Sequence, residues 1–334
     1  MKAVVCRQYG GPGTAALEDV APPGIRPGAV RIRVEACAAS FASLLVMEGK
    51  HQNRAPLPLI PGTEVAGVVT ELGGGTSHFR LGDRVIAGVQ SGGYAQEVVV
   101  PEQTVFHLPP AMDFTVGAQF PTIYGTAYGA LKWRAALAPG EIVLVHGAAG
   151  GSGLAAVEVA KALGATVIAT AGSQAKRDMV LRHGADHAID YRGTDWREQV
   201  LALTGGRGAD VIYDPVGGET FDTSLRCIAP DGRIVVMGFA SGTIPSIPAN
   251  IVLVKNISIL GVYWGYYFGW GRHAVPPSND TRLRRAYEQL FAWTLEGKLN
   301  PRAHAVLPLS RFETALEMIA SRQVMGRVIM RPQE

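Results

Sequence analysis

The sequence has few cysteines, little excess charge and no uninterrupted apolar run long enough to span a membrane. Its three cysteines, Cys6, Cys37 and Cys227, lie far apart without a CxxC spacing, which excludes a disulfide framework and favours a reducing compartment. Lysine and arginine number 31 and aspartate and glutamate 28, so the net charge is only +3. This charge is spread along the chain, and a basic face that binds nucleic acid is therefore not expected.

Targeting and membrane signals are also weak. Residues 1–13 lack the apolar core of a signal peptide. The most membrane-like stretch, 251–270, is interrupted by Lys255 and Asn256 and contains three glycines, which suits a buried strand and a loop better than a membrane helix. With 47% hydrophobic and 18% charged residues among 334, the chain can bury a sizeable core in about two domains. We expect a soluble, cytoplasmic protein without a membrane partner.

The use of proline marks a change in architecture along the chain. Proline is frequent up to Pro121, absent from 140 to 214, and present again later. Before residue 123 the pattern predicts a small β-barrel or sandwich, with short strands at 2–6, 29–35, 64–72, 84–88 and 95–101. From 123 onward it predicts a parallel sheet covered by helices on both faces, with strands at 141–146, 166–170, 187–190, 209–213, 233–238 and 257–263. Helices are expected at 152–163, 174–183, 282–296 and 311–320, and a last strand at 327–330 is expected to complete the first domain.

The glycine-rich segment 147–153 follows the first apolar strand of the middle region and precedes an amphipathic helix. Against the GxGxxG pattern, Ala148 takes the first position, Gly150 the second and Gly153 the third. The middle glycine lets the backbone approach a pyrophosphate, and the last lets the helix pack close to the strand. The N–H groups of Gly151 and Ser152 would then face the phosphates at the helix N-terminus. A glycine cluster alone could be a tight turn, but this context predicts dinucleotide binding.

The end of the second strand indicates which dinucleotide is bound. NAD-binding folds place an acidic residue about 20 residues further on, where it holds the ribose 2′-OH. Here the segment 170–177, TAGSQAKR, has no acid and offers a hydroxyl and two cations. These groups suit a 2′-phosphate, so the expected cofactor is NADP(H). The alternative is that the segment is simply the solvated, basic start of a helix.

Eight short motifs together resemble one known family. They are GGP at 10–12, PGTEVAG at 61–67, GDRV at 82–85, GTAY at 125–128, AAGGSG at 148–153, GADH at 184–187, DPVGG at 214–218 and GFASG at 238–242. In this order and spacing they are similar to the zinc-independent NADPH:quinone oxidoreductases of the medium-chain dehydrogenase/reductase superfamily. The resemblance implies an α/β protein with a GroES-like β-rich catalytic domain (1–122 and 268–334) and a Rossmann-type doubly wound parallel-sheet domain (123–267). It places the active site in the cleft between them.

The resemblance also implies cofactor contacts along the middle of the chain. The expected set is Tyr128, Gly150, Gly151, Ser152, Gly172, Ser173, Lys176, Tyr191, Pro215, Gly238, Phe239, Ala240, Ser241, Val262 and Tyr263. Tyr191 would lie beside the adenosine, and 238–241 with 262–263 would line the nicotinamide side. Tyr128 and Tyr191 could instead be interior tyrosines. The family's pairing of edge strands further implies a homodimer through 257–262.

Metal ligands are missing where zinc alcohol dehydrogenases of this superfamily carry them. The positions that hold a Cys and a His in those enzymes are Ser40 and Thr63 here, and neither hydroxyl is a good Zn²⁺ ligand. Cys37 is three residues early and is interpreted as a small buried hydrophobe. His183 and His187 are four residues apart, but Gly184 and a following strand argue against a helical metal pair. No metal is expected.

One departure from the quinone reductase pattern leaves the substrate open. The family commonly has Asn-Phe-Ala-Asp where this chain has Ser40-Phe41-Ala42-Ser43, and a tyrosine found nearby in some members is Leu45. Ser40 can still donate one hydrogen bond to a substrate oxygen, which makes it the candidate catalytic residue. A purely structural serine is an equal alternative.

An aromatic run at 263–270 holds six aromatic residues and two glycines. We weigh a mobile wall that stacks on a flat acceptor against a packed interdomain or dimer surface. On the first reading, Phe41, Trp264 and Tyr267 line the substrate pocket.

These features lead to one leading function and two alternatives. Without a Lewis acid, hydride transfer from NADPH suits an acceptor that is already electrophilic, such as a quinone. The alternatives are an enoyl or alkenal reductase acting on α,β-unsaturated carbonyls, and an NADPH-binding protein without significant turnover. A G-x-S-x-G elbow and a P-loop are both absent from the sequence, which argues against hydrolase and NTPase functions.

Overall fold

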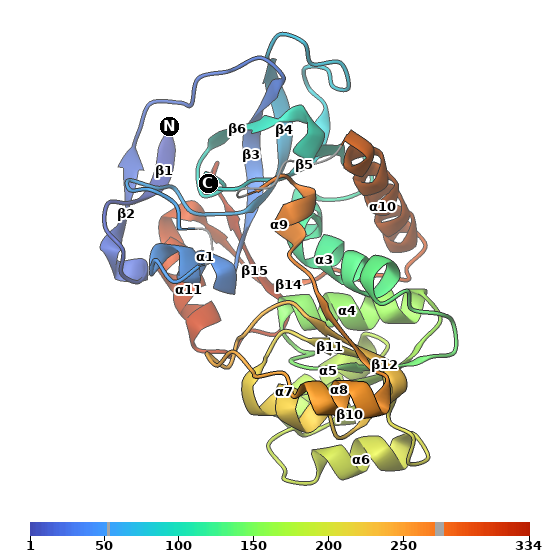
Figure 1. The fold of residues 1–334 in the computed structure, drawn as a ribbon. Coiled ribbons are helices and arrows are strands. Elements are labelled where there is room, and N and C mark those ends of the chain that lie inside the picture. Colours follow the sequence, from blue (N-terminus) through green and yellow to red (C-terminus); the bar gives the residue numbers. More distant parts are fainter. Residues whose placement is uncertain (52–53, 271–276) are drawn as a thin grey trace. The chain divides into compact units, whose positions relative to one another are not determined.

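The computed structural model describes residues 1–51, 54–270 and 277–334 (Figure 1). The chain forms two compact units, each built from more than one segment. The first comprises Met1–Thr122, Gly265–Phe291 and Pro301–Glu334, and the second comprises Ile123–Trp264 and Ala292–Asn300. Residues 292–300, which the sequence assigns to the first domain, pack with the second unit.

The first unit is rich in antiparallel strands. Its strands are β1 (Lys2–Cys6), β2 (Ala15–Asp19), β3 (Ala29–Ala39), β4 (Glu64–Leu72), β5 (Arg84–Gly88), β6 (Glu97–Pro101), β7 (Val105–His107), β14 (Ala303–Pro308) and β15 (Arg327–Arg331). Its helices are η1 (Pro12–Thr14), α1 (Phe41–Met47), η2 (Glu102–Thr104), α2 (Phe114–Gly117), η3 (Phe120–Tyr124, which crosses into the second unit), η5 (Leu309–Arg311) and α11 (Phe312–Ala320). Strands β1 and β2 form a separate two-stranded sheet.

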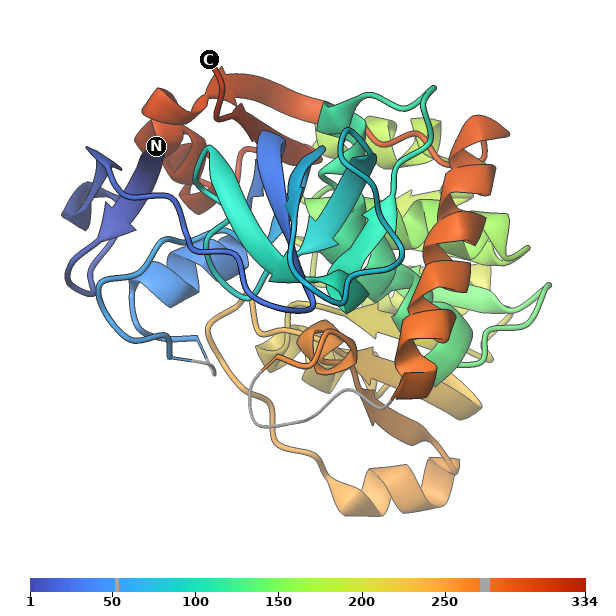
Figure 2. The same cartoon turned by 90° about the horizontal axis from the view of Figure 1, so that it is seen from above.

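Strand β3 is the centre of the main sheet of this unit. It is 11 residues long, mostly buried, and pairs antiparallel with β4, β6 and β15. The sheet order is β14-β15-β3-β4-β5-β7 with β6 beside β3, and its strands curve when seen from above in Figure 2. The pairing of β15 with β3 confirms that the last strand of the chain completes the first unit.

A buried ion pair fixes this C-terminal strand to the sheet. Glu64, at the start of β4, is fully buried and accepts hydrogen bonds from the Thr122 backbone N–H (3.0 Å) and from Arg327 in β15. Burial lowers the pKa of Arg327 to about 10, yet the guanidinium remains charged at neutral pH. Since removal of one partner leaves a buried charge alone, this pair makes the first unit depend on the end of the chain.

The second unit is a parallel sheet with helices between its strands. The strands are β8 (Ile142–Val145), β9 (Thr166–Thr170), β10 (His187–Ile189), β11 (Ala209–Asp214), β12 (Ile228–Val236) and β13 (Ser258–Gly261). The helices are α3 (Gly125–Tyr128), η4 (Gly129–Arg134), α4 (Gly151–Ala162), α5 (Gln174–Arg182), α6 (Trp196–Leu203), α7 (Gly218–Ser224) and α8 (Ala249–Lys255). Helices α9 (Trp264–Tyr267) and α10 (Pro277–Leu295) pass from one unit to the other.

The strand order in this sheet is β10-β9-β8-β11-β12-β13, and every pairing is parallel. This is the order of a doubly wound dinucleotide-binding sheet, in which the direction of winding reverses between the first and fourth strands, here β8 and β11. The fold class predicted from the sequence is confirmed.

Several expected elements differ in detail. Strand β12 begins at Ile228 rather than at residue 233, because Pro230, Asp231 (φ 58°) and Gly232 form an irregularity within the strand instead of a turn before it. The stretch 251–270 was expected to be a strand and a loop. It contains the end of α8, strand β13 and helix α9.

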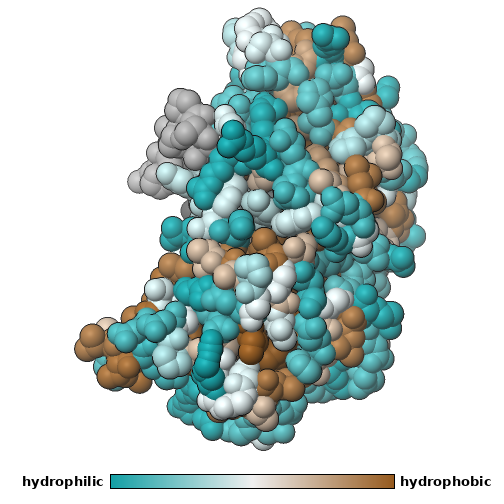
Figure 3. Space-filling model, turned by 90° about the vertical axis from the view of Figure 1, so that its right-hand side faces the viewer, coloured by the Kyte–Doolittle hydropathy of each residue, from teal (hydrophilic) through white to brown (hydrophobic). Residues whose placement is uncertain are grey.

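Helix α8 presents apolar side chains to solvent. Leu253 and Val254 are 76% and 73% exposed. The helix projects from the second unit in Figure 2, and Figure 3 shows hydrophobic residues gathered on a projection at the lower left. Among the residues that the structure describes, no helix is both long and apolar enough to cross a membrane.

Candidate functional site

The predicted cofactor residues of the second unit gather at the carboxyl edge of its sheet. Gly150, Gly151 and Ser152 follow β8; Gly172, Ser173 and Lys176 follow β9; Tyr191 follows β10; Pro215 follows β11; Gly238, Phe239, Ala240 and Ser241 follow β12; and Val262 and Tyr263 follow β13. The carboxyl ends of parallel strands meet at one edge, which is where open α/β sheets bind their ligands. Tyr128, from α3, is the one predicted cofactor residue that does not follow a strand.

The glycine turn after β8 is shaped by close backbone approach. Gly147 has a φ of +58°, which favours glycine. At Gly153 a Cβ atom would lie 2.3 Å from the Gly147 carbonyl oxygen, so helix α4 can pack here only on a glycine. At Gly150 the nearest atom to a Cβ would be the same oxygen at 3.4 Å, an ordinary contact. Gly150 therefore leaves open space beside the turn, as a pyrophosphate would require.

Ser152 lies in the first turn of α4, and its side chain points into the unit. Its hydroxyl is 2.6 Å from the hydroxyl of Tyr213, a fully buried residue of β11. Burial raises the pKa of Tyr213, so this phenol stays neutral. The first turn of an α-helix leaves its N–H groups without an intrahelical acceptor. The groups at Gly151 and Ser152 that suit an anion are therefore backbone donors.

The turn after β9 brings three predicted residues together. Ser173 is the N-cap of α5, and its hydroxyl accepts the Lys176 backbone N–H at 3.3 Å. The Tyr191 ring covers Gly172, because a Cβ there would lie 2.9 Å from the Tyr191 hydroxyl oxygen. Tyr191 is half exposed, so it is not the interior tyrosine that the alternative interpretation described.

Charged side chains surround this turn. Asp190, just after β10, bonds Arg177 (2.7 Å) and Arg192 (2.9 Å), and these arginines hold the pKa of its carboxyl well below the usual range. Of the two cations expected at a 2′-phosphate, Arg177 is thus held by Asp190, and Lys176 lies in the first turn of α5. Lys176, Arg177 and Arg192 together outnumber Asp190, so the net charge of these four side chains is positive.

The loops after β11 and β12 are joined by backbone hydrogen bonds. The Ala240 N–H donates to the Pro215 carbonyl and the Ser241 N–H to the Val216 carbonyl, both at 3.0 Å. One Asp214 carboxylate oxygen accepts the N–H groups of Val216 (2.8 Å) and Gly217 (3.0 Å). These bonds place Pro215 and the predicted nicotinamide-side residues in one connected surface.

Three further predicted residues of the second unit differ in burial. Tyr128 is half-buried, with its ring edge-on to Trp133 (5.8 Å) and tilted against Trp293 (5.9 Å). Val262 is buried and its N–H donates to the Val236 carbonyl, whereas Tyr263 is 41% exposed. Val262 therefore closes the end of the sheet, and Tyr263 offers a ring to solvent.

Ser40, the candidate catalytic residue, belongs to a buried hydroxyl cluster in the first unit. It is the N-cap of α1, where its Oγ accepts the Ser43 N–H (3.1 Å) and lies 2.9 Å from Ser43 Oγ. The fully buried Tyr94 adjoins both serines and donates to the Ala38 carbonyl at 3.2 Å. Burial raises the pKa of Tyr94, so the cluster consists of neutral hydroxyls.

The aromatic run is largely packed. Trp264 is 5% exposed, stacks on Trp133 at 5.5 Å, and lies so close to Gly125 and Gly129 that a Cβ at either would overlap its ring. This favours packing over a mobile wall for Trp264, whose place in a substrate pocket stays a prediction. Tyr267 is half-buried and Phe41 is 42% exposed.

The two positions that hold zinc ligands in related dehydrogenases carry Ser40 and Thr63. The hydroxyl of Ser40 caps a helix, and the backbone carbonyl of Thr63 accepts the Val89 N–H at 2.9 Å, which leaves no zinc-type ligand at either position. Cys37 is fully buried in β3, and burial raises the pKa of its thiol, which confirms its interpretation as a small hydrophobe. His183 bonds the buried Glu158. Within residues 1–51, 54–270 and 277–334, no three acidic, His or Cys side chains form a potential metal site.

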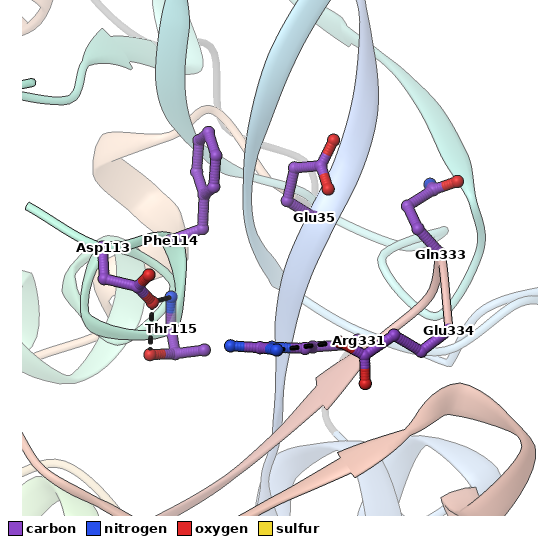
Figure 4. A pocket seen from close by; sticks show the side chains of 7 residues that line it. All are labelled: Glu35, Asp113, Phe114, Thr115, Arg331, Gln333 and Glu334. Carbon is purple, nitrogen blue, oxygen red and sulfur yellow. Dashed lines mark hydrogen bonds and ion pairs between the residues drawn. The ribbon is translucent and has the colours of Figure 1, made fainter.

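A shallow pocket in the first unit has no catalytic character. About 120 Å³ in volume, it is lined by Glu35, Asp113, Phe114, Thr115, Arg331, Gln333 and Glu334 (Figure 4). Asp113 caps α2 through the Thr115 N–H (2.7 Å), and Arg331 pairs with Glu334 (2.8 Å). Its main charged groups are therefore already engaged.

Two residues of functional interest, His146 and Asp214, lie in segments that the sequence marks but have no role predicted from it. His146 immediately precedes the glycine turn, and Asp214 begins the segment DPVGG. Both are at most 1% exposed. The signal that could have found them is a polar residue at the carboxyl end of an otherwise apolar strand.

Comparison with known proteins identifies the family. Residues 26–110 match the alcohol dehydrogenase GroES-like domain, and residues 151–278 match the zinc-binding dehydrogenase family. Quinone oxidoreductase-like protein 2 of Bos taurus is 37% identical over 98% of this chain and 92% of its own length. Escherichia coli quinone oxidoreductase complexed with NADPH has a TM-score of 0.89 at 28% identity, covering 99% and 100% of the two chains. A 2-haloacrylate reductase has a TM-score of 0.86 at 31% identity over the whole of both chains. The chain belongs to the zinc-independent quinone oxidoreductase family of the medium-chain dehydrogenase/reductase superfamily.

Proposed function

We propose that this oxidoreductase uses NADPH to reduce quinones and that it needs no metal. The observation that carries the proposal is the carboxyl edge of the second unit, where an open glycine turn lies beside a basic turn without an acidic residue at the end of β9. The name of the Escherichia coli neighbour, a quinone oxidoreductase complexed with NADPH, supports the same cofactor.

The choice of NADPH over NADH rests on the turn after β9. A ribose 2′-OH is usually held by an acid at this point, and the residues here are Ala171, Gly172 and Ser173. Ser173 uses its oxygen as an N-cap acceptor, which leaves its O–H to donate to a phosphate. A charge-assisted hydrogen bond contributes about 1.5–3 kcal/mol, so Lys176 and Ser173 together would favour NADPH about ten- to several-hundredfold.

The segments that follow the strands of the second unit supply most of the remaining proposed cofactor contacts. The backbone N–H groups of Gly151 and Ser152 hold the pyrophosphate, and Tyr191 covers the adenosine side. Pro215 and Gly238–Ser241, with Val262 and Tyr263, line the nicotinamide side, and Tyr128 adds a further contact. Bound NADPH would supply the hydride.

The proposed reaction requires few catalytic groups from the chain. A quinone accepts a hydride without a Lewis acid because its oxygen takes the negative charge, and the proton can come from water. We propose that Ser40 donates a hydrogen bond to a substrate oxygen, and that Phe41 and Tyr267 contact the acceptor. The neighbouring Ser43 hydroxyl fixes the position of Ser40 Oγ.

One observation favours a second candidate function. The 2-haloacrylate reductase, similar over its whole length, is named for an α,β-unsaturated substrate. Reduction of the double bond of an enone makes the same demands on the protein as reduction of a quinone. The alternative activity is therefore that of an NADPH-dependent enoyl or alkenal reductase.

We also propose that two copies associate through 257–262. Strand β13 lies at the edge of the sheet, where unpaired backbone groups can pair with another chain. The adjacent α8 exposes Leu253 and Val254. A dimer in sedimentation that dissociates in Leu253→Glu would support this assembly, and a monomeric wild-type chain would exclude it.

The acceptor class is tested by steady-state kinetics with NADPH and NADH against a panel of quinones and enones. Turnover of quinones with a higher kcat/KM for NADPH supports the proposal. Turnover of enones alone moves the assignment to the double-bond reductase. NADPH binding without turnover of any acceptor indicates a non-catalytic protein, and equal use of NADH rejects the role of the basic turn.

A further inference from the structure

A buried histidine stands directly before the glycine turn and takes no part in the function proposed above. His146 follows the last residue of β8 and is 1% exposed. Its backbone N–H donates to the Tyr213 carbonyl at 3.1 Å, which ties it to the neighbouring strand β11. A buried polar ring at this point requires partners, since an unsatisfied polar group is costly.

Both ring nitrogens have such partners. Nε2 is 2.8 Å from Ser224 Oγ in α7, and Nδ1 is 3.2 Å from Thr170 Oγ1 at the end of β9. Ser224 donates its own hydrogen to the Thr220 carbonyl at 2.7 Å, so its oxygen must accept from the ring. With Ser224 donating to Thr220, Nε2 carries the proton and Nδ1 faces the Thr170 hydroxyl, which also lies 3.5 Å from the Val145 carbonyl oxygen.

The surroundings keep this ring neutral. Trp196 of α6 lies edge-on to it at 5.3 Å. The buried carboxylate of Asp214, in β11, favours the charged form of the ring. Burial lowers the pKa of His146 to about 4 against the opposing effect of Asp214, so the ring carries no charge at neutral pH.

Strands β8 and β9 end at the cofactor edge where the ring joins them, and α7 is joined at its last residue, Ser224. The Thr170 carbonyl also accepts the N–H of Ala148, within the glycine turn, at 3.1 Å. Helix α7 begins at the end of the DPVGG segment. A shift of the imidazole would therefore move the glycine turn, the end of β9 and the C-terminal end of α7 relative to one another.

We propose that His146 is a positioning residue of the dinucleotide site, whose imidazole holds the glycine turn after β8 at a fixed spacing from the end of β9 and from α7. This inference rests on the proposed dinucleotide binding. It assigns His146 no contact with the cofactor. Its effect is on cofactor affinity, equally for NADPH and NADH, because both share the pyrophosphate.

The test measures Kd for NADPH and NADH by fluorescence, together with KM and kcat, in four variants. His146→Phe keeps the ring contact with Trp196 and removes both hydrogen bonds. His146→Gln keeps a donor toward Ser224, and Thr170→Val removes only the other partner. Val200→Ala, at a buried position of α6, is the control for a loss of stability without a change at the turn.

His146→Phe is expected to raise Kd and KM about tenfold for both coenzymes by the same factor, with kcat at saturating NADPH unchanged. Thr170→Val should raise Kd by a smaller factor, His146→Gln should retain most of the affinity, and Val200→Ala should retain all of it. The positioning role is overturned if His146→Phe and Thr170→Val bind both coenzymes as the wild type does, or if Val200→Ala weakens binding as much as His146→Phe. A wild-type chain that binds neither coenzyme overturns the proposed function and this role with it.

Discussion

The substitution Gly150→Ala separates the function of the glycine turn from its role in the fold. Gly150 is the N-cap of α4 with φ −80° and ψ 166°, a conformation that any residue can adopt. An added Cβ would meet only the Gly147 carbonyl oxygen at 3.4 Å. The chain by itself therefore does not require glycine at this position.

The expected changes in stability and in the Kd for NADPH follow from this geometry. Alanine is a poorer N-cap than glycine, but it lowers the entropy of the unfolded chain, so the two effects nearly cancel and stability should change by no more than about 0.5 kcal/mol. A methyl group facing the pyrophosphate would cost one or two charge-assisted hydrogen bonds of about 1.5–3 kcal/mol each. The Kd for NADPH should rise at least about tenfold.

Gly153→Ala is the matched comparison. Its Cβ would lie 2.3 Å from the Gly147 carbonyl oxygen and 2.6 Å from Ala148 Cα, so the backbone must move. Stability should fall by about 1–3 kcal/mol, and NADPH binding should weaken as a consequence.

Chemical denaturation measures the stability of both variants, and fluorescence titration measures their affinity for NADPH. The expected result is that Gly150→Ala loses affinity at unchanged stability, whereas Gly153→Ala loses both. A Gly150→Ala protein that binds NADPH as tightly as the wild type would show that no pyrophosphate lies on this turn.

Three further predictions concern charge. Lys176→Glu should raise KM for NADPH about tenfold or more and leave KM for NADH unchanged, because only NADPH has a 2′-phosphate; an equal change for both coenzymes would contradict its role. The pKa of His146 is about 4 when folded and 6.5 ordinarily, so the unfolded chain takes up the proton first and stability is lost as pH falls from 6.5 to 4. The free energy of unfolding, measured by denaturation at each pH, should fall by about 3 kcal/mol over this range in the wild type. In His146→Phe this part of the pH dependence should be missing, and the rest should match that of the wild type. Glu64→Gln should cost about 3–5 kcal/mol in unfolding free energy because Arg327 loses its buried partner, and Glu64→Leu with Arg327→Met should restore most of it; a Glu64→Gln protein as stable as the wild type would exclude a structural role for the pair.

The sequence predicts elements best where one periodicity dominates. Strand β4 was expected at 64–72 and β5 at 84–88, and the structure has both within these bounds. Strand β12 was expected too late because the proline and glycine in 228–232 signal a turn in the sequence, whereas pairing of Ile228 and Arg233 with β11 on either side of them keeps this irregularity within the strand. Whether such a segment is a turn or part of a strand depends on neighbouring strands that are distant in sequence.

The candidate site was predictable to the extent that it depends on backbone. The spacing of the glycines indicates the turn after β8, and the structure has it at the end of the expected strand. Side-chain partners could not be predicted in the same way. That Arg177 bonds Asp190, and that Trp264 packs on Gly125 and Gly129, depends on residues brought together only by folding.

We propose that this chain transfers hydride from NADPH to a quinone without a metal. The most direct test is the rate of NADPH oxidation by a benzoquinone, measured with enzyme that has been dialysed against a chelator and whose metal content is known. Metal-free enzyme is expected to oxidise NADPH at an undiminished rate and to prefer NADPH over NADH. A rate that disappears with the metal and returns on adding Zn²⁺ would contradict this proposal, because Ser40 and Thr63 would then stand at a metal site held by other ligands.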